Sequence, residues 1–266
     1  MTTVAALTIA GSDSGGGAGI QADLKTFSAL GVYGASVVTA VTAQNTCAVT
    51  AIHPIPAGII RAQIDAVLSD IKVHAIKIGM LGTPDATLAV SGGVASYDGM
   101  VVLDPVMVAK SGDALLTEEA VTALLRHLVP RADLVTPNLP EAAKLLGAEQ
   151  AQGRDAAVAQ GRAICALGAR AVLMKGGHAD GPLCEDVLVS AEGVSVFTSP
   201  RIATRNTHGT GCTLSSAIAA ELARGRPLAE AVGVAHGWLH AAITRADELE
   251  IGSGHGPVHH FHGTWQ

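Results

Sequence analysis

Aromatic residues are scarce in this chain of 266 residues, where Phe, Trp and Tyr together make up 3%. Apolar residues nevertheless reach 48%, and Ala, Val, Leu and Ile supply most of them. This composition is typical of helices packed on buried parallel strands and argues against a β-sandwich. The length allows one large α/β domain or two small ones. Because no linker-like, low-complexity or repeated segment divides the chain, we expect residues 1–266 to form a single domain.

Cysteine is also rare, and the four cysteines lie far apart, at Cys47, Cys165, Cys184 and Cys212. This spacing fits neither a zinc site with paired cysteines nor a small disulfide framework. Reduced thiols in a cytoplasmic protein are the simplest interpretation.

Long apolar runs are absent, because no stretch approaches the roughly 18 residues that a membrane-spanning helix needs. Residues 1–10 have no basic region, so we expect a first strand there and no signal peptide. The net charge of −6 gives no sign of a nucleic-acid partner or of an anionic membrane surface. Small anionic ligands can still bind through backbone amides and single cations.

Short apolar runs alternate with amphipathic helical patterns along most of the chain. The expected strands are residues 4–10, 36–42, 75–78, 100–103, 133–136 and 171–175, with a hairpin of 185–190 and 194–198. The expected helices are residues 19–30, 56–70, 84–95, 117–128, 140–146, 155–167, 210–223 and 228–249. This alternation predicts a mainly parallel sheet with helices on both faces. Ligands bind such sheets beyond the carboxyl ends of the strands, where polar or glycine residues follow six of the predicted strands.

The most informative segment is NTHGTGCT at residues 206–213, which leads directly into a predicted helix. Two glycines let the backbone turn sharply and approach a ligand. The free N–H groups and positive dipole end of the helix make an anion site. Cys212 stands at this junction, where the pKa of a thiol tends to fall, so a thiolate or general base is plausible. Taken alone, the segment is better explained by a glycine-rich helix start with a buried cysteine.

Three other motifs do not carry a function in this context. The DSGG of residues 13–16 is like a serine-protease nucleophile loop, but too little chain precedes it and the scaffold is wrong. The GAGIQA of residues 17–22 fits a dinucleotide fingerprint without the acidic residue that should end the next strand. No Walker A sequence occurs, and the C-terminal histidines have no spacing that enforces a metal site.

Taken in order, the motifs resemble the ribokinase-like superfamily, and within it the hydroxymethylpyrimidine/phosphomethylpyrimidine kinases of thiamin biosynthesis. The matching segments are AGSDSGGGAGIQADLK at 10–25, TAQNT at 42–46, KIGML at 77–81, LDPVM at 103–107, TPNLPE at 136–141, KGGH at 175–178 and NTHGTGCT at 206–213. They span nearly the whole chain in the family's order. The resemblance implies a three-layer α/β/α fold without the large lid of sugar kinases, and the homodimer that the family commonly forms.

The resemblance also implies phosphoryl transfer from ATP, which depends mainly on positioning and charge neutralisation. The amides of Gly209, Thr210, Gly211 and Cys212 would hold the migrating phosphate. The side chain of Cys212 would act as base toward the acceptor hydroxyl, where most ribokinase-like enzymes have an aspartate. The residues expected to bind ATP phosphates are Lys175, Asn138 and Thr207.

Asn138 and Glu141 resemble the family's site for organising Mg²⁺ and phosphate, where a carboxylate binds the ion through water. Their spacing is equally that of a helix capping box, and both roles are compatible. Asp104, directly before Pro105, would join the metal or phosphate network or simply form a turn.

The acceptor that the resemblance implies is a flat aminopyrimidine, for which Gln44 would offer both amide functions and Asp23 an acceptor for the exocyclic amine. Met80 and Val106 could pack on the ring, and the backbone of Gly11 and Ala18 could complete the pocket. A basic side chain near the rim of the acceptor pocket, such as Lys25 or Lys110, could assist the second phosphorylation.

Three functions are therefore open at this point. The first is an ATP- and Mg²⁺-dependent kinase that phosphorylates 4-amino-5-hydroxymethyl-2-methylpyrimidine and then its monophosphate. The second is a pyridoxal or pyridoxine kinase, or an enzyme that accepts both rings, because relatives share the scaffold. The third is a pyrimidine sensor without catalysis, which the presence of Cys212, Asn138 and Glu141 disfavours.

Overall fold

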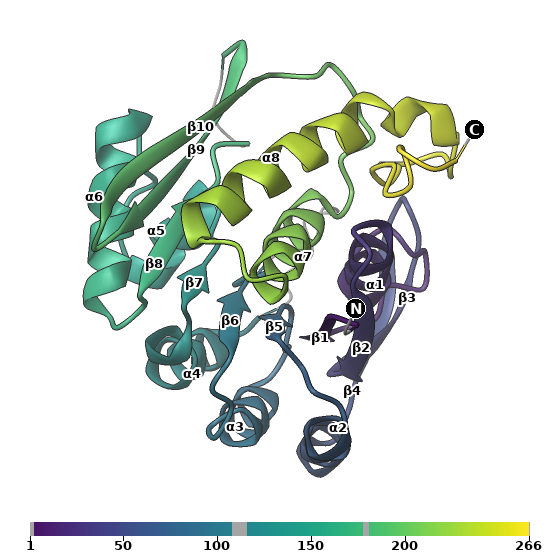
Figure 1. The fold of residues 1–266 in the computed structure, drawn as a ribbon, viewed down its shortest axis with the longest axis vertical. Helices are drawn as coiled ribbons and strands as arrows, with labels where there is room; N and C mark the ends of the chain where they lie inside the picture. Colours follow the sequence, from purple (N-terminus) through teal and green to yellow (C-terminus); the bar gives the residue numbers. More distant parts are fainter. Residues whose placement is uncertain (1–2, 108–115, 178–180, 266) are drawn as a thin grey trace.

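The computed structural model describes residues 3–107, 116–177 and 181–265, which build a central sheet between two layers of helices (Figure 1). The eight strands of this sheet have the order β10-β9-β8-β7-β6-β5-β1-β2. They are β1 (Ala5–Ala10), β2 (Tyr33–Val38), β5 (Ala75–Ile78), β6 (Met100–Leu103), β7 (Leu134–Val135), β8 (Ala171–Met174), β9 (Leu183–Ser190) and β10 (Gly193–Pro200). Within this sheet, neighbouring strands from β8 through β7, β6, β5 and β1 to β2 pair in parallel. Strand β9 pairs antiparallel with both β8 and β10.

Helices cover both faces of the sheet, as the alternating pattern predicts. One face carries α1 (Gly19–Ala29), α7 (Thr210–Ala223) and α8 (Leu228–Thr244). The other carries α2 (Ala57–Asp70), α3 (Pro84–Gly93), α4 (Glu118–His127), α5 (Leu139–Leu146) and α6 (Gly153–Ala166). Two short 3₁₀ helices, Val129–Arg131 and Ala246–Leu249, follow α4 and α8. The predicted fold class, a three-layer α/β/α arrangement with a mainly parallel sheet, is confirmed.

Each helical layer packs on its own apolar cluster, and both clusters include side chains of the central strands. A strand in such a position is buried on both faces, which explains runs such as AALTIA in β1, where every residue is buried. In β5, Ala75 and Lys77 face the layer of α1 and α7, whereas Ile76 and Ile78 face the opposite layer. Lys77 is therefore a charged residue at a position where the pattern calls for an apolar one.

Local sequence sets several helix starts. Thr83 and Thr117 are N-caps whose side chains accept hydrogen bonds from the backbone of Ala86 and Ala120. The cap predicted at Thr117 is thus present, and Glu118 and Glu119 lie in the first turn, where the helix dipole favours them. In the described chain no helix combines the length and the apolar character that crossing a membrane requires.

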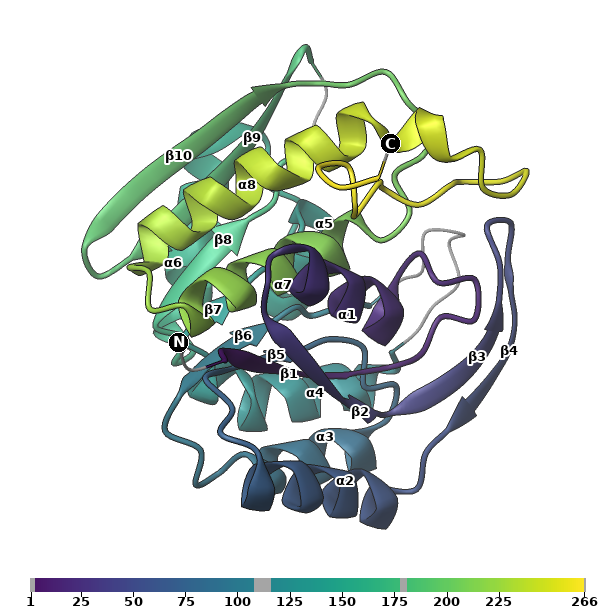
Figure 2. The same ribbon diagram turned by 45° about the vertical axis from the view of Figure 1, so that its right-hand side comes forward.

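The segment 36–42, predicted to be one strand, breaks at Thr39. Strand β2 ends at Val38, and the chain leaves the sheet to form a separate ribbon of β3 (Ala40–Gln44) and β4 (Val49–Pro54), seen at the edge of the molecule in Figure 2. The backbone N–H of Thr39 bonds to the carbonyl of Ala10, and its hydroxyl donates to the carbonyl of Met80 at 2.7 Å. These bonds hold the exit point of the ribbon beside the ends of β1 and β5.

Candidate active site

A cavity of about 670 Å³ opens at the carboxyl ends of the parallel strands. Its wall includes the residues that follow four strands: Gly11 after β1, Met80 after β5, Asp104 after β6 and Lys175 after β8. Parallel strands place these ends at one edge of the sheet, so residues far apart in sequence meet there. The volume lies within the range of small-molecule sites.

The start of α7 forms one wall of the cavity. Gly209 is its N-cap with φ of +77°, and a Cβ there would lie 1.8 Å from the carbonyl oxygen of Gly17. Only glycine fits this contact, which holds the loop before α7 against the loop after β1. The N–H of Thr213 makes an intrahelical bond with Gly209, whereas the N–H groups of Gly211 and Cys212 belong to the first turn. The predicted anion cradle is thus at a helix N-terminus that lines the cavity.

Lys175 lies beside this helix start. A Cβ on Gly211 would be 3.2 Å from Nζ of Lys175, so the ammonium group and the first turn of α7 are adjacent. Lys175 Nζ donates to Asp104 Oδ1 at 2.8 Å and lies 3.9 Å from Glu141 Oε2. Burial works against its charge, but Asp104 and Glu141 outweigh it and raise the pKa of Lys175. The amine therefore stays protonated and available to an anionic ligand.

Asp104 is fully buried under Lys175 and is held by hydroxyl groups on both oxygens. Thr136 donates to Oδ1 and Ser215 of α7 donates to Oδ2, each at 3.2 Å. Burial opposes ionisation of this carboxyl group, but Lys175 and Lys77 lower its pKa below the usual value. Asp104 thus balances the lysine charge instead of acting only as a turn former.

Glu141 has the capping role that its spacing predicts. Its carboxylate accepts the N–H of Asn138, and Oδ1 of Asn138 accepts the N–H of Glu141, each at 2.8 Å. This capping box starts α5 and places both residues on the cavity wall. Burial raises the pKa of Glu141 to about 7, with Lys175 acting in the opposite direction.

The carboxylates of Asp104 and Glu141 have the chemistry of a weak magnesium site. Within the described ranges, no group of three or more His, Cys, Asp or Glu could hold a metal ion. Magnesium keeps several waters and is commonly bound by one or two carboxylates together with phosphate groups. Two carboxylates on one cavity wall, on either side of a lysine, fit that mode and do not fit a fully protein-ligated ion.

Cys212 is half-buried at the start of α7 and lines the cavity. The expectation that its thiol pKa falls is wrong. Burial raises it to about 11, with Lys77 lowering it and Asp23 and Asp104 raising it. The N–H of Gly19 bonds to the thiol group and favours the thiolate, but loss of solvation outweighs it. The resting thiol is therefore protonated near neutral pH.

The acceptor residues expected from sequence, with the exception of Asp23, line the same cavity: Gly11, Ala18, Gln44, Met80 and Val106. Asp13 fixes the loop between β1 and α1, because its carboxylate accepts the N–H groups of Gly15 and Ala18 at 2.8 Å. It also contacts Nε2 of His208 at 2.8 Å, an interaction that sequence reasoning missed.

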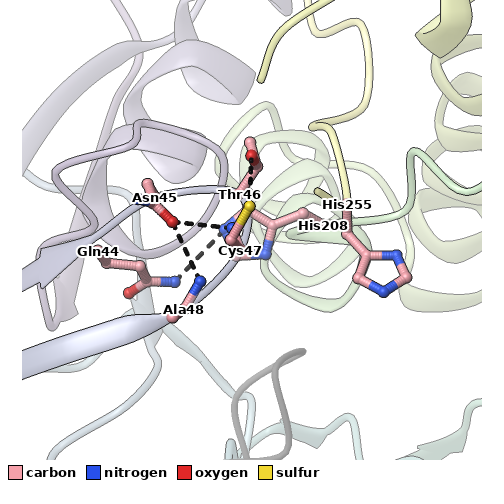
Figure 3. Close-up of a pocket in the computed structure, with 7 residues that line it drawn as sticks. All are labelled: Gln44, Asn45, Thr46, Cys47, Ala48, His208 and His255. Carbon is pink, nitrogen blue, oxygen red and sulfur yellow. Dashed lines mark hydrogen bonds between the residues drawn. The ribbon is translucent and has the colours of Figure 1, made fainter. Parts of the chain in front are cut away.

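Gln44 ends β3 and reaches the cavity beside His208. Figure 3 shows the two side chains pointing toward one another, with Nε2 of Gln44 3.5 Å from Nε2 of His208. They also border a small neighbouring pocket of about 10 Å³, closed by residues 45–48 and His255. Gln44 thus comes from the ribbon, Gly11 and Ala18 from the sheet and α1, so the acceptor wall is assembled from three separate segments.

The structure does not place Asp23 at the cavity wall, which contradicts its predicted contact with a ring amine. The side chain is fully buried, and both oxygens contact Nζ of Lys77, at 3.0 and 2.9 Å. Thr8 and Ser216 also donate to it, each at 2.6 Å. A carboxylate with these partners has no access to a ligand. One acidic residue in the first turns of a helix gives no sequence signal of such burial.

The structure does not support the lysines that the sequence suggested for the second phosphorylation. Nζ of Lys25 donates to the carbonyl of Gly16 at 2.7 Å and does not line the cavity, whereas Lys110 lies outside the described residues. Sequence reasoning missed another lysine on the wall, Lys144 of α5. Its position on the helix that follows the TPNLPE segment is the signal that could have found it.

The comparisons with known proteins place this geometry in a family context. A family model described as phosphomethylpyrimidine kinase matches residues 13–259. The chain is 56% identical to the hydroxymethylpyrimidine/phosphomethylpyrimidine kinase of Rhizobium meliloti over 264 residues, covering 99% of each chain. It is 51% identical over 258 residues to the thiamine biosynthesis bifunctional protein ThiED of Geobacter sulfurreducens, covering 96% of this chain and 51% of that protein.

A solved structure gives the same fold. The ADP complex of Bacillus subtilis pyridoxal kinase superposes with a TM-score of 0.91 at 38% sequence identity, and the match covers 100% of both chains. A similar scaffold therefore binds an adenine nucleotide.

Proposed function

The chain belongs to the phosphomethylpyrimidine kinase family, and on this premise we propose how its cavity carries out two phosphoryl transfers. The enzyme phosphorylates the hydroxymethyl group of 4-amino-5-hydroxymethyl-2-methylpyrimidine and then converts the monophosphate to the diphosphate, in thiamin biosynthesis. The observation that supports a single site for both steps is the cavity itself. It joins the start of α7, Lys175 and the acceptor wall around Gln44 and Met80.

The phosphate end of the cavity neutralises charge. ATP phosphates lie against the first turn of α7, where Gly209, Thr210, Gly211 and Cys212 offer backbone N–H groups, and Thr207 and Asn138 line the approach. Lys175 supplies the cation beside the migrating group. Phosphoryl transfer requires mainly this positioning and charge stabilisation. Asp104 and Glu141 would hold Mg²⁺ through its water ligands, and the ion would supply further neutralisation of the phosphates.

The acceptor end orients the reacting oxygen. Gln44 bonds to the pyrimidine edge, Met80 and Val106 cover its face, and Gly11 and Ala18 let the backbone approach it. Cys212 lies on the wall between the two ends. Its thiolate form takes the proton of the hydroxymethyl group as the O–P bond forms, and the bond from the γ-phosphorus to the bridging oxygen of ATP breaks to release ADP.

The decisive experiment is Mg²⁺-dependent ADP release by the purified protein, with the pyrimidine alcohol supplied or omitted. We expect strong stimulation and consumption of about two ATP per acceptor, because two ester bonds form in sequence. Pyridoxal is tested in parallel as an alternative acceptor, since the Bacillus subtilis relative is a pyridoxal kinase. Binding of the pyrimidine without ADP formation at any Mg²⁺ concentration would instead identify a sensor, and preference for pyridoxal would overturn the pyrimidine assignment.

A substitution of Glu141 can distinguish its role in helix capping from its proposed role in Mg²⁺ binding. Gln also suits the N3 position of a capping box, so we expect Glu141→Gln to keep the melting temperature near that of the native protein. Loss of the carboxylate should raise the Mg²⁺ concentration for half-maximal rate by roughly 10–100-fold. Mg²⁺ titrations of the initial rate and thermal unfolding of the same samples check both expectations. An unchanged Mg²⁺ requirement would restrict Glu141 to capping.

We propose that two copies of the chain associate through the edge formed by β2 and the β3–β4 ribbon. Four large apolar side chains are exposed there, on β2, β3, β4 and the neighbouring α2: Tyr33, Val41, Ile52 and Ile59. Edge strands with apolar side chains favour pairing with another chain. The ribbon also carries Gln44 to the cavity, so association at this edge would support the acceptor wall.

A charge on this edge should weaken association. We expect Ile52→Glu to shift the protein from dimer toward monomer in analytical ultracentrifugation. Val194→Glu on the opposite edge strand β10 is the matched control, because Val194 is exposed to a similar extent, 41% against 43% for Ile52. A monomeric native protein, or dimer loss in both variants, would contradict the proposed edge.

Two further assignments follow the same premise. We propose that the 266 residues act as one domain, because the apolar cluster under α7 joins residues from Ala6 to Val258. We also propose a cytoplasmic location, where thiols stay reduced, since all four cysteines are free.

A further inference from the structure

The ion pair of Lys77 and Asp23 has no role in the steps described above, although it lies directly beneath the cavity floor. Both side chains have 0% exposure, and Nζ of Lys77 is 2.9 Å from Oδ2 of Asp23. Burying such a pair is costly, and well-packed apolar residues of similar volume are often at least as stable. Stability therefore does not explain why this strand carries a lysine.

Helices α1 and α7 lie side by side over the pair and connect it to Cys212. In the first turns, the N–H of Gly19 bonds to the thiol of Cys212. One turn further along both helices, Ser216 donates to Asp23 at 2.6 Å. Cys212 and Ser216 are four residues apart and so lie on the same face of α7, as do Gly19 and Asp23 on α1. The thiol and the ion pair thus occupy neighbouring turns of one helix contact.

Lys77 approaches this contact from below. A Cβ on Gly79 would be 2.7 Å from Nζ of Lys77, so the ammonium group lies against the backbone that leads to Met80 on the cavity wall. Hydroxyl groups complete the partners of Asp23, with Thr8 donating at 2.6 Å. The network is closed to solvent, and electrostatic interactions inside it are weakly screened.

Four charged groups act on Cys212, each from a different element. Lys77 of β5 and Lys175 after β8 favour the thiolate, whereas Asp23 of α1 and Asp104 after β6 oppose it. Lys175 and Asp104 also face the cavity and serve the phosphate groups. Lys77 and Asp23 do not line the cavity. Lys77 also interacts with Asp104, but both members of the pair act on the thiol.

We propose that the buried Lys77–Asp23 pair is a positioning element that sets the ionisation and orientation of Cys212, with Lys77 promoting the thiolate and Asp23 limiting it. The proposal rests on the proposed base role of Cys212 for its catalytic consequence, but not for the charge effect itself. It assigns opposite signs to the two partners. A purely structural pair would instead give the same loss from either substitution.

The test measures alkylation of Cys212 by iodoacetamide as a function of pH, with kinase rates measured on the same samples. Trypsin places each cysteine on a separate peptide, and residues 206–224 contain Cys212. Cys184 is the internal control, because it also lines the cavity while the charged groups that act on it are Asp186 and Arg201. Its alkylation should not change in any variant.

We expect Asp23→Asn to speed alkylation of Cys212 at neutral pH by about tenfold and Lys77→Met to slow it by a similar factor, since one charge nearby shifts a pKa by about one unit or more. In Asp23→Asn, Asp104 and the thiolate itself remain to keep Lys77 charged. The pH profile of the first phosphorylation should shift to lower pH in Asp23→Asn and to higher pH in Lys77→Met.

Lys77→Met leaves Asp23 without its cation and can fail to fold, so the double variant Lys77→Met/Asp23→Asn accompanies it. Compared with Asp23→Asn alone, the double variant isolates the charge of Lys77 in a neutral background, and we expect slower alkylation. Equal reactivity of these two variants, or slower alkylation in Asp23→Asn than in the native protein, would overturn the proposal. Opposite alkylation shifts without any kinase activity would uphold the charge effect and reject the base role.

Discussion

Cys212→Ala should slow the first phosphorylation by about 10²–10⁴-fold, the usual cost of a lost acid/base group, and affect the second far less. The difference follows from the two acceptors. The first acceptor is an alcohol, whose proton must leave as the O–P bond forms. The second is a phosphate monoester with a second pKa near 6, so its attacking oxygen is already unprotonated above pH 7. Only the first step then needs a base.

The pH dependence of the first step tests the same idea. With a thiol pKa of about 11, roughly one in 10⁴ molecules carries the thiolate at pH 7. Because the thiolate is the form that accepts a proton, kcat/KM of the free enzyme should rise about tenfold per pH unit from neutral pH toward 11. Cys212→Asp, a carboxylate that is ionised at neutral pH, should give a flatter profile.

Each step is measured separately by supplying the alcohol or the monophosphate with ATP. Cys165→Ala is the control, because Cys165 is half-buried on α6 and does not line the cavity. We expect both of its rates to match the native protein. Near-normal turnover of the alcohol by Cys212→Ala would exclude the base role, and equal losses in both steps would show that the side chain positions phosphate instead.

The helices and strands that have a clear local signal could be predicted from the sequence. Strands β5 and β6 and helix α7 have the predicted limits, because apolar runs bounded by glycine or proline are local signals. The same logic places Asp104, Asn138 and Lys175 together, since each lies at the end of a predicted strand or within two residues after it. Topology alone brings them to one edge of the sheet.

What sequence could not supply is burial. Asp23 and Lys77 are 54 positions apart, and nothing local in either segment shows that they meet beneath the cavity. The thiol of Cys212 gives the same lesson, because the helix N-terminus is visible in sequence and the desolvation that outweighs it is not. The break at Thr39 could not be predicted, because the bonds that fix it come from Ala10 and Met80, at the ends of two other strands.

Gly209→Ala should lower kcat/KM of both phosphorylations by about 10²-fold, since displacement of reacting groups by about 1 Å can have such a cost. A Cβ at this position would lie 1.8 Å from the carbonyl of Gly17, so the loop after β1 and the start of α7 must separate. Both steps use the N–H groups of this helix start, whereas only the first uses the thiol. The two losses should therefore be similar, unlike those of Cys212→Ala.

Gly225→Ala is the matched control for this substitution. Gly225 follows the other end of α7 with φ of +84°, and a Cβ there would meet no atom within 4 Å. Both variants therefore carry the backbone cost of a side chain in the left-handed region, about 1–2 kcal/mol, but only Gly209→Ala forces two loops apart. We expect Gly225→Ala to have a lower melting temperature than the native protein and unchanged rates of both phosphorylations. If Gly209→Ala were equally active, the N-terminus of α7 would not be the place where the phosphoryl group is held, because a cradle that tolerates this displacement cannot position a transition state.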